Sequence, residues 1–177
     1  MTEVPNPPTP EEIESAIGKL AGEIATRHAR TDKLAIIGIA NGGILLARTL
    51  RDRIAQELGR DIPLGAADIC FHRDDLARNP IPKDTGPTEI PVEVDGTDIV
   101  IVDDVLFTGR SVRAAINEVF DLGRPNRIEL AILYDRGGRK LPIHPDFRAF
   151  HHQHPLESQV EVVLDPDNPQ NHVITFV

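Results

Sequence analysis

Two adjacent carboxylates, Asp103 and Asp104, follow a continuous apolar run and are the residues of this sequence best placed to do chemistry. The run, residues 99–102, lies in a segment, residues 98–102, that predicts a strand buried on both faces of a sheet. Three apolar residues after the acids, the chain reads Thr-Gly-Arg-Ser at residues 108–111, directly before a stretch with helical periodicity. The spacing therefore brings two acids and a helix N-terminus to the same end of one strand.

The two halves of this stretch suit different parts of one ligand. A helix N-terminus presents unpaired N–H groups and the positive end of the helix dipole, so it favours a phosphate. Gly109 lets the backbone approach a ligand closely. The hydroxyls of Thr108 and Ser111 can donate to phosphate oxygens, and Arg110 adds positive charge. Carboxylates suit hydroxyl groups instead, and a vicinal diol beside a phosphate is a ribose 5-phosphate; the alternative is a capping turn that only satisfies backbone groups.

This stretch resembles the motif with which type I phosphoribosyltransferases bind 5-phosphoribosyl-1-pyrophosphate (PRPP). The resemblance implies that Asp103 and Asp104 hold the ribose 2′- and 3′-hydroxyls. It also implies that the following loop holds the 5′-phosphate, with these residues: Leu106, Phe107, Thr108, Gly109, Arg110 and Ser111. Both acids then count as catalytic residues as well as PRPP-binding residues.

A second turn follows the apolar run at residues 34–39 and contains Ala40, Asn41 and Gly42. Its position resembles that of the pyrophosphate loop in the same family. The resemblance implies that backbone amides there face the leaving diphosphate and form an anion-binding nest. The alternative is a plain strand-to-helix turn.

Four stretches, in matching order and spacing, resemble the PyrR family of bifunctional pyrimidine operon attenuators with uracil phosphoribosyltransferase activity: residues 68–76, 102–110, 121–125 and 135–143. The resemblance implies a reaction in which uracil and PRPP give UMP and diphosphate with Mg²⁺. The metal is expected to bridge diphosphate and ribose oxygens, because Mg²⁺ commonly keeps waters and substrate oxygens as ligands. No metal site made of protein ligands is expected, and a homodimer is implied.

Three more residues acquire roles through this resemblance. Arg73 begins a long polar loop, residues 72–91, and is a candidate to stabilise charge on the diphosphate. That loop is expected to be flexible and to close over the site and exclude water. Asp135 and Arg136 follow a predicted strand and are candidates to bind the pyrimidine base. The plain alternatives are a solvated arginine for Arg73 and a turn residue for Asp135.

Two segments depart from the family pattern. Residues 41–43 read Asn-Gly-Gly where the family commonly has Thr-Arg-Gly, so a positive side chain is missing beside the expected diphosphate. Residues 149–155 replace the usual Gly-Lys-Asn-Ile-Pro-Thr, so the resemblance does not fix which base is preferred. A purine phosphoribosyltransferase therefore stays an alternative. The histidines at 151, 152 and 154 are interpreted as a polar loop, because their spacing does not suit a zinc site.

A second alternative is an RNA-binding regulator that responds to UMP or UTP with weak or no catalysis. In the family, RNA binding is attributed to a basic face. Basic residues in the first helix and in a later loop offer such a patch here: Lys19, Arg27, His28, Arg30, Arg136, Arg139, Lys140 and Arg148. Ordinary solvated charges explain the same residues equally well.

The remaining sequence supplies the elements that position these residues. Periodicity predicts helices over 10–28, with Thr9 and Glu12 as a capping box, over 44–58, and from 110 to about 123. Apolar runs predict strands over 34–39, 66–71, 98–102, 128–133, 159–164 and 172–177. Strands that alternate with helices predict an α/β fold with a mostly parallel sheet, whose ligands bind at the carboxyl ends of the strands. The resemblance adds a small hood. Residues 1–177 are predicted to form one domain, of which residues 1–8 are a proline-rich lead-in.

Composition is that of a globular domain, with 40% hydrophobic and 27% charged residues. The formal net charge of −9 argues against strong non-specific binding to nucleic acid. No apolar stretch reaches the roughly 20 residues that cross a bilayer, and the first residues do not resemble a signal peptide. The single cysteine, Cys70, reads as a buried strand thiol. We therefore expect a cytoplasmic protein with no membrane partner.

Overall fold

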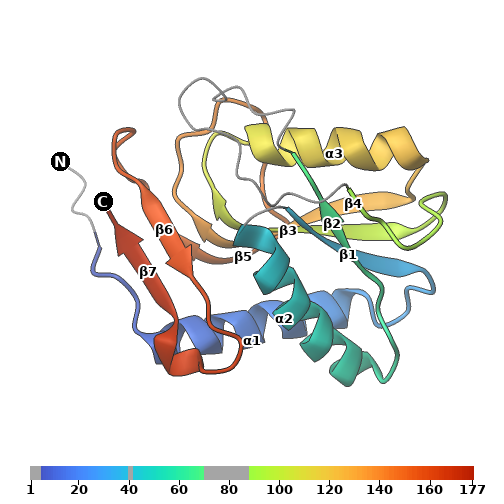
Figure 1. Cartoon of the computed structure of the whole chain (residues 1–177), viewed down its shortest axis with the longest axis horizontal. Helices are drawn as coiled ribbons and strands as arrows, with labels where there is room; N and C mark the ends of the chain where they lie inside the picture. The colour runs from blue at the N-terminus through green and yellow to red at the C-terminus, as the bar shows by residue number, and fades with distance from the viewer. Residues whose placement is uncertain (1–4, 40–41, 70–87) are drawn as a thin grey trace.

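The computed structural model describes residues 5–39, 42–69 and 88–177, and these residues form an α/β fold (Figure 1). The elements in chain order are α1 (Pro10–Arg27), β1 (Leu34–Ile39), α2 (Gly42–Leu58), β2 (Leu64–Ala67), β3 (Asp98–Leu106), α3 (Arg110–Leu122), β4 (Arg127–Asp135), β5 (Phe147–His151), β6 (Val160–Val163), the 3-10 helix η2 (Pro169–Asn171) and β7 (Val173–Phe176). Parallel strands form a central sheet in the order β2-β1-β3-β4-β5, and β6 and β7 form an antiparallel hairpin. The predicted fold class is confirmed.

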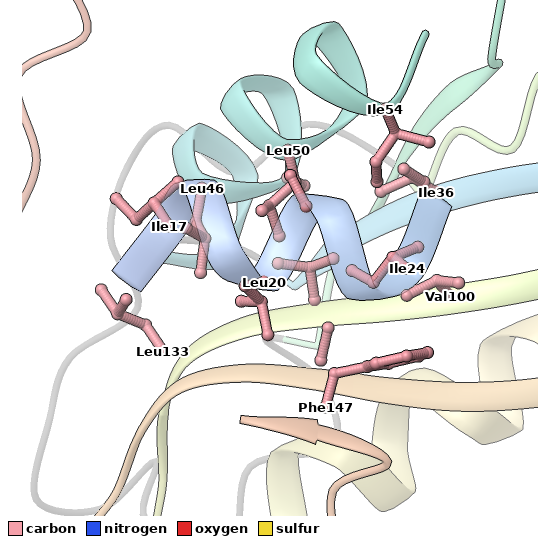
Figure 2. Packing of buried hydrophobic residues seen from close by; sticks show 14 of the residues in the cluster. Ile17, Leu20, Ile24, Ile36, Leu46, Leu50, Ile54, Val100, Leu133 and Phe147 are labelled. Atoms are coloured by element: carbon pink, nitrogen blue, oxygen red, sulfur yellow. The ribbon is translucent and has the colours of Figure 1, made fainter. Parts of the chain in front are cut away.

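The central sheet is buried on both faces because continuous apolar runs fill its middle strands. All six residues of β1 and the first six of β3 are buried. One face, with Ile36 and Val100, packs against α1 and α2 (Figure 2). The other face, with Ile37 and Ile101, packs against α3. Each such side chain withdrawn from water contributes roughly 1.5–3 kcal/mol, so the core fixes the sheet whose carboxyl edge carries the polar residues.

The first helix forms as its sequence predicts. The Thr9 hydroxyl accepts from the Glu12 N–H over 3.2 Å, and the Glu12 carboxylate accepts from the Thr9 N–H over 2.8 Å. This reciprocal capping box satisfies two donors that a helix N-terminus otherwise leaves unpaired. The apolar stripe is fully or almost fully buried: Ile13, Ile17, Leu20 and Ile24. It holds α1 against α2 and the sheet (Figure 2).

Several predicted boundaries differ in the structure. β3 continues to Leu106, past the two acids that the sequence places in a turn, because residues 105 and 106 pair with the last two residues of β4. The strand predicted over 66–71 begins earlier, at Leu64, and ends at Ala67, where its partner β1 also ends. α2 begins at Gly42, so residues 42–43 lie in a helix instead of a turn. In each case pairing or packing with a neighbour decides the boundary.

The strand β5 is not predicted by the sequence. Its five residues, Phe-Arg-Ala-Phe-His, carry no clear two-residue alternation, and the strand exists because it pairs with β4 at the edge of the sheet. The two late strands are confirmed as the hairpin β6–β7, which stands beside the start of α1 (Figure 1). In the turn between them, the Asp165 carboxylate accepts from the N–H groups of Asp167 and Asn168.

None of the helices in the described ranges is both long and apolar enough to cross a membrane.

Candidate active site

Asp103 and Asp104 lie near the carboxyl end of β3, where the chain leaves the apolar core. Consecutive strand side chains point to opposite faces, and Asp103 is the more buried of the two, with 8% of its surface exposed. Nearby backbone groups orient both carboxylates. The Asp104 N–H donates to Asp103 Oδ1 over 3.0 Å, and the Val105 N–H donates to Asp104 Oδ1 over 2.8 Å. The two neighbouring acids are therefore held in place near the carboxyl end of the central strand of the sheet.

The start of α2 lies directly against these acids. A Cβ atom at Gly42 would overlap the Asp104 carboxylate, and a Cβ atom at Gly43 would lie 3.0 Å from the Asp103 Cα and would overlap the Val102 carbonyl oxygen. The structure thus brings the two predicted ligand-binding turns together. It also shows what the two glycines of the Asn-Gly-Gly departure permit, since a Cβ atom at Gly42 would require the Asp104 carboxylate to move and one at Gly43 would require the β3 backbone to move.

Burial disfavours the charged form of both acids. It raises the pKa of Asp103 well above the ordinary value of 3.8, and the neighbouring Asp104 charge raises it further. Burial also raises the pKa of Asp104, although hydrogen bonds from Asp103 and nearby N–H groups offset part of the effect. Within the described residues neither acid forms an ion pair. Such carboxylates gain from a bound cation or from hydroxyl donors.

In the loop after β3, the backbone carbonyl groups and the backbone N–H groups differ in their hydrogen bonding. Backbone N–H groups of residues 136, 140 and 141 donate to the carbonyls of Leu106 and Thr108 over 3.0–3.2 Å. Among the described residues, no acceptor takes the backbone N–H groups of residues 107–109. Gly109 precedes α3 with φ +88°, in the left-handed region that favours glycine. The carbonyls are thus occupied, while the N–H groups at the start of α3 stay available to an anion.

The other side chains of the loop surround this N-terminus. The Thr108 hydroxyl accepts from the Arg110 N–H over 3.3 Å, a local contact of the kind that a capping turn makes. The Arg110 side chain is exposed and Ser111 is half-buried. The Phe107 ring lies under the Arg136 guanidinium, with 3.9 Å from Cζ to the ring centroid.

Asp135 and Arg136, the predicted base-binding pair, are both buried at the end of β4. Burial by itself would raise the pKa of Asp135, but hydrogen bonds from Arg139 and the Gly137 N–H, together with the Arg139 charge, bring it below the ordinary value. The Arg136 guanidinium donates to the carbonyls of residues 155 and 158 over 2.7 and 2.5 Å. Both side chains are therefore engaged by the protein itself, and a role in base binding stays a prediction.

The interpretation of the histidines as a polar loop is wrong for His151, which lies in a strand, while His154 lies in a loop but is buried. His151 ends β5, and His154 is buried with its Nε2 2.8 Å from the Tyr134 hydroxyl. The sequence misses the contact of His154 because its partner, Tyr134, lies in β4, 20 residues earlier. Burial raises the pKa of Tyr134 to about 12 and lowers the pKa of His154. No group of three or more His, Cys, Asp or Glu suited to a metal occurs in the described residues.

The predicted basic patch is smaller than its residue list suggests. His28 is buried, with its Nε2 2.7 Å from Glu129, and Arg27 pairs with the same carboxylate over 2.7 Å. Arg136 is buried, and Arg139 pairs with Asp135. The sequence cannot distinguish these from solvated charges because their partners lie on other elements. The exposed cations of the patch are these: Lys19, Arg27, Arg30, Lys140 and Arg148, of which Arg27 and Arg148 also form ion pairs.

Four predictions lie wholly or mainly outside the described residues: the roles of Ala40, Asn41 and Arg73, and the buried strand thiol of Cys70. Of the predicted loop 72–91, only its last residues are described. They return beside β2, where Ala66 and Glu89 exchange backbone hydrogen bonds of 2.8 and 2.9 Å. Sequence reasoning missed the contact of Gly43 with β3; the paired glycines directly after a buried strand were its available signal.

Comparison with known proteins places this geometry in a class. The family model "Phosphoribosyl transferase domain" matches residues 9–165. The hypoxanthine phosphoribosyltransferase of Trypanosoma cruzi has a TM-score of 0.67 at 18% identity, over 95% of this chain and 93% of that one. A hypoxanthine phosphoribosyltransferase of Staphylococcus aureus has a TM-score of 0.65 at 20% identity, over 98% and 91%. The fold and the family match together define a type I phosphoribosyltransferase.

The curated relatives are more specific. The chain is 38% identical over 162 residues to the bifunctional protein PyrR of Geobacter sp. (strain M21), covering 92% of each chain. It is 40% identical over 167 residues to that of Bacillus cereus (strain AH820), covering 93% of this chain and 92% of the relative. It is 46% identical over 138 residues to that of Chloroflexus aurantiacus, covering 77% and 75%. The chain belongs to the PyrR family.

Proposed function

We propose that this protein transfers the phosphoribosyl group of PRPP to uracil, giving UMP and diphosphate. A ring nitrogen of uracil forms the new bond to ribose C1′, the C1′–O bond to diphosphate breaks, and the nitrogen proton is released. The observation that carries the proposal is the position of Asp103 and Asp104 on β3, directly before the N–H groups of residues 107–109, which have no acceptor in the part of the chain that the structure describes. Membership of the PyrR family supports uracil as the base.

The residues divide the work between the two ends of the ribose phosphate. Asp103 and Asp104 accept hydrogen bonds from the vicinal hydroxyls, and the N–H groups of residues 107–109 donate to the 5′-phosphate. The transition state carries positive charge on the ribose, and two fixed carboxylates stabilise that charge without having to reorganise. Gly42 and Gly43 bring the start of α2 close to the acids, so the leaving diphosphate would meet backbone groups there.

The residues also fit Mg²⁺. Two adjacent carboxylates with raised pKa values, which form no ion pair within the described ranges, are donors that gain from a divalent cation. They would hold it mainly through water and substrate oxygens. When bound, Mg²⁺ neutralises charge on the leaving diphosphate.

On the base side we propose that uracil meets the segment around Asp135 and Arg136. This segment is tied to residues after β5 by hydrogen bonds from His152 N–H to the Asp135 carbonyl, 3.0 Å, and from His154 N–H to the Arg136 carbonyl, 3.1 Å. The Asp135 carboxylate already binds Arg139, so pairing with the pyrimidine imide falls to the local backbone. Arg73 and closure of the loop 72–91 remain part of the proposal, as does a homodimer.

The deciding experiment measures diphosphate release from PRPP and Mg²⁺ with uracil and, separately, with hypoxanthine, guanine and orotate. We expect turnover with uracil that the Asp103→Asn/Asp104→Asn variant loses. Turnover with a purine but not with uracil would replace the proposed base. Absence of turnover with every base would overturn the enzymatic proposal.

An RNA-binding regulator with weak catalysis is the second candidate. The observation that favours it is Gly42, which lies against the Asp104 carboxylate and supplies no positive side chain at the expected diphosphate position. If the protein binds RNA, phosphate contacts predict an affinity that falls steeply with salt concentration. A flat salt dependence, or no binding, would remove this candidate.

A further inference from the structure

Arg139 forms several hydrogen bonds with the end of β3 and the loop that follows it, residues 107–109, which we call the phosphate-side loop. A cation in a solvated basic patch would not be held in this way. Its side chain is 17% exposed. Its Nη1 donates to the carbonyl of Phe107 over 2.6 Å and to that of Leu106 over 3.3 Å. Its Nε donates to the Ile143 carbonyl over 3.1 Å. One guanidinium thus joins the end of β3 to the segment that follows β4.

The charge of this guanidinium is balanced at the same place. Its Nη2 lies 2.5 Å from Asp135 Oδ1, and Asp135 is buried at the last position of β4. Arg148 reaches the same carboxylate from β5 over 3.4 Å, but among the described residues it forms no hydrogen bond with the loop. Arg139 is therefore neutralised by one partner while its remaining donors hold carbonyl oxygens.

The carbonyls that Arg139 holds decide where the loop N–H groups point. In a trans peptide the C=O of one residue and the N–H of the next point in opposite directions within one plane. Fixing the carbonyls of Leu106 and Phe107 toward Arg139 therefore turns the N–H groups of Phe107 and Thr108 the other way. The Thr108 carbonyl, held by residues 140 and 141, does the same for Gly109. All three N–H groups lack an acceptor among the described residues.

We propose that Arg139 is a positioning residue for the 5′-phosphate, which acts by holding these peptide planes with their N–H groups toward the ligand. This inference rests on the proposed function and deepens it. Without Arg139 a peptide can rotate and present a carbonyl oxygen to the phosphate dianion, which repels it. Lysine cannot substitute, because its ammonium is a point charge while the planar guanidinium serves several acceptors at fixed angles.

The test compares Arg139→Lys with Arg148→Gln, which removes the other cation at Asp135 and leaves the loop contacts in place. Calorimetry with ribose 5-phosphate gives the affinity, and steady-state kinetics give KM for PRPP and for uracil separately. We expect Arg139→Lys to bind ribose 5-phosphate roughly 10-fold to 100-fold more weakly, because misplacement by about 1 Å can have an effect of this size. KM for uracil should change less than the affinity for ribose 5-phosphate, and Arg148→Gln should bind ribose 5-phosphate as tightly as the wild-type protein does.

Wild-type affinity for ribose 5-phosphate in Arg139→Lys would overturn the positioning role. If Arg139→Lys does not fold, the Asp135→Asn/Arg139→Gln variant takes its place, because removing both partners of a buried pair is far less costly than removing one. The same loss of affinity is expected there. A wild-type protein that binds neither PRPP nor ribose 5-phosphate would instead refute the proposed function, so the two failures are distinguishable.

Discussion

The charged form of Asp103 lies in a place where water does little to stabilise it. Its pKa is raised by burial and by Asp104, so the folded protein takes up a proton more readily than the unfolded chain does. The free energy of unfolding from this group therefore falls as the pH rises from the ordinary pKa of 3.8 through the raised pKa of the folded state. In our proposal, a bound ligand stabilises the charged form of Asp103 by donating hydrogen bonds to it.

Asp103→Asn should make the protein more stable and inactive. At about pH 7 we expect the free energy of unfolding to rise by about 1 kcal/mol, which is roughly 2–4 °C in Tm for a chain of this size. Turnover should be lost because an amide is a poorer acceptor for the diol. Thermal melts and diphosphate release measure the two effects. Asp121→Asn, at an exposed position of α3, is the control and should change neither; a lower Tm in Asp103→Asn would contradict the pKa argument.

Gly42→Ala and Gly43→Ala should separate activity from stability. A Cβ at Gly42 meets only the Asp104 carboxylate, which can rotate away, so we expect weaker PRPP binding with a nearly unchanged Tm. A Cβ at Gly43 meets the backbone of β3, which cannot move freely, so we expect a loss of about 1–3 kcal/mol. Urea unfolding and calorimetry with PRPP report the two quantities. Equal effects of both variants on stability would show that the contact with the carboxylate is as rigid as that with the backbone.

At the scale of elements, the sequence predicts the interior of each helix and central strand but not where strands end. The capping box at Thr9 and the apolar runs at 34–39 and 98–102 are local signals, and the structure confirms them. The extension of β3 through Asp103 and the existence of β5 depend on pairing with β4, which no local pattern records. The site residues at 103–111 were predictable because one continuous segment contains them. The contacts of Arg139 were not, because its partners are backbone carbonyls of residues more than 30 positions earlier in the sequence.

The C-terminus of α1 is tied to β4 by a buried cluster that should control how firmly the helix docks. Glu129 accepts from Arg27 and contacts His28, both over 2.7 Å, while Arg127 lies 3.7 Å away on the exposed side. Glu129→Ala leaves the buried His28 without this partner and should lower the free energy of unfolding by about 3 kcal/mol. Arg127→Ala should change it by less than about 1 kcal/mol. Urea unfolding measures both; similar values for the two variants would mean that the cluster adds nothing beyond a surface ion pair.

For the whole molecule, the buried pair of Asp135 and Arg139 should shape acid unfolding. The pKa of Asp135 is lowered in the folded state, so its stabilising contribution is complete above the ordinary value of 3.8 and is lost as the pH falls through the lowered pKa. We expect wild-type stability to fall over this range and the Asp135→Asn/Arg139→Gln variant to fall less. Urea unfolding from about pH 6 to about pH 2.5 gives the comparison. Parallel curves would show that other carboxyl groups cause acid unfolding.

Two buried or half-buried arginines, Arg136 and Arg139, donate several of their hydrogen bonds to main-chain carbonyls. Arg136 holds the carbonyls of Pro155 and Ser158, and Arg139 holds those of Phe107 and Ile143. Every amino acid supplies the same carbonyl group. The residues whose carbonyls accept these bonds can therefore be substituted without loss of the hydrogen bonds that fix their backbone. If side chains near 149–155 set the base preference, as the sequence predicts, they can be replaced while the loop after β3 keeps its place.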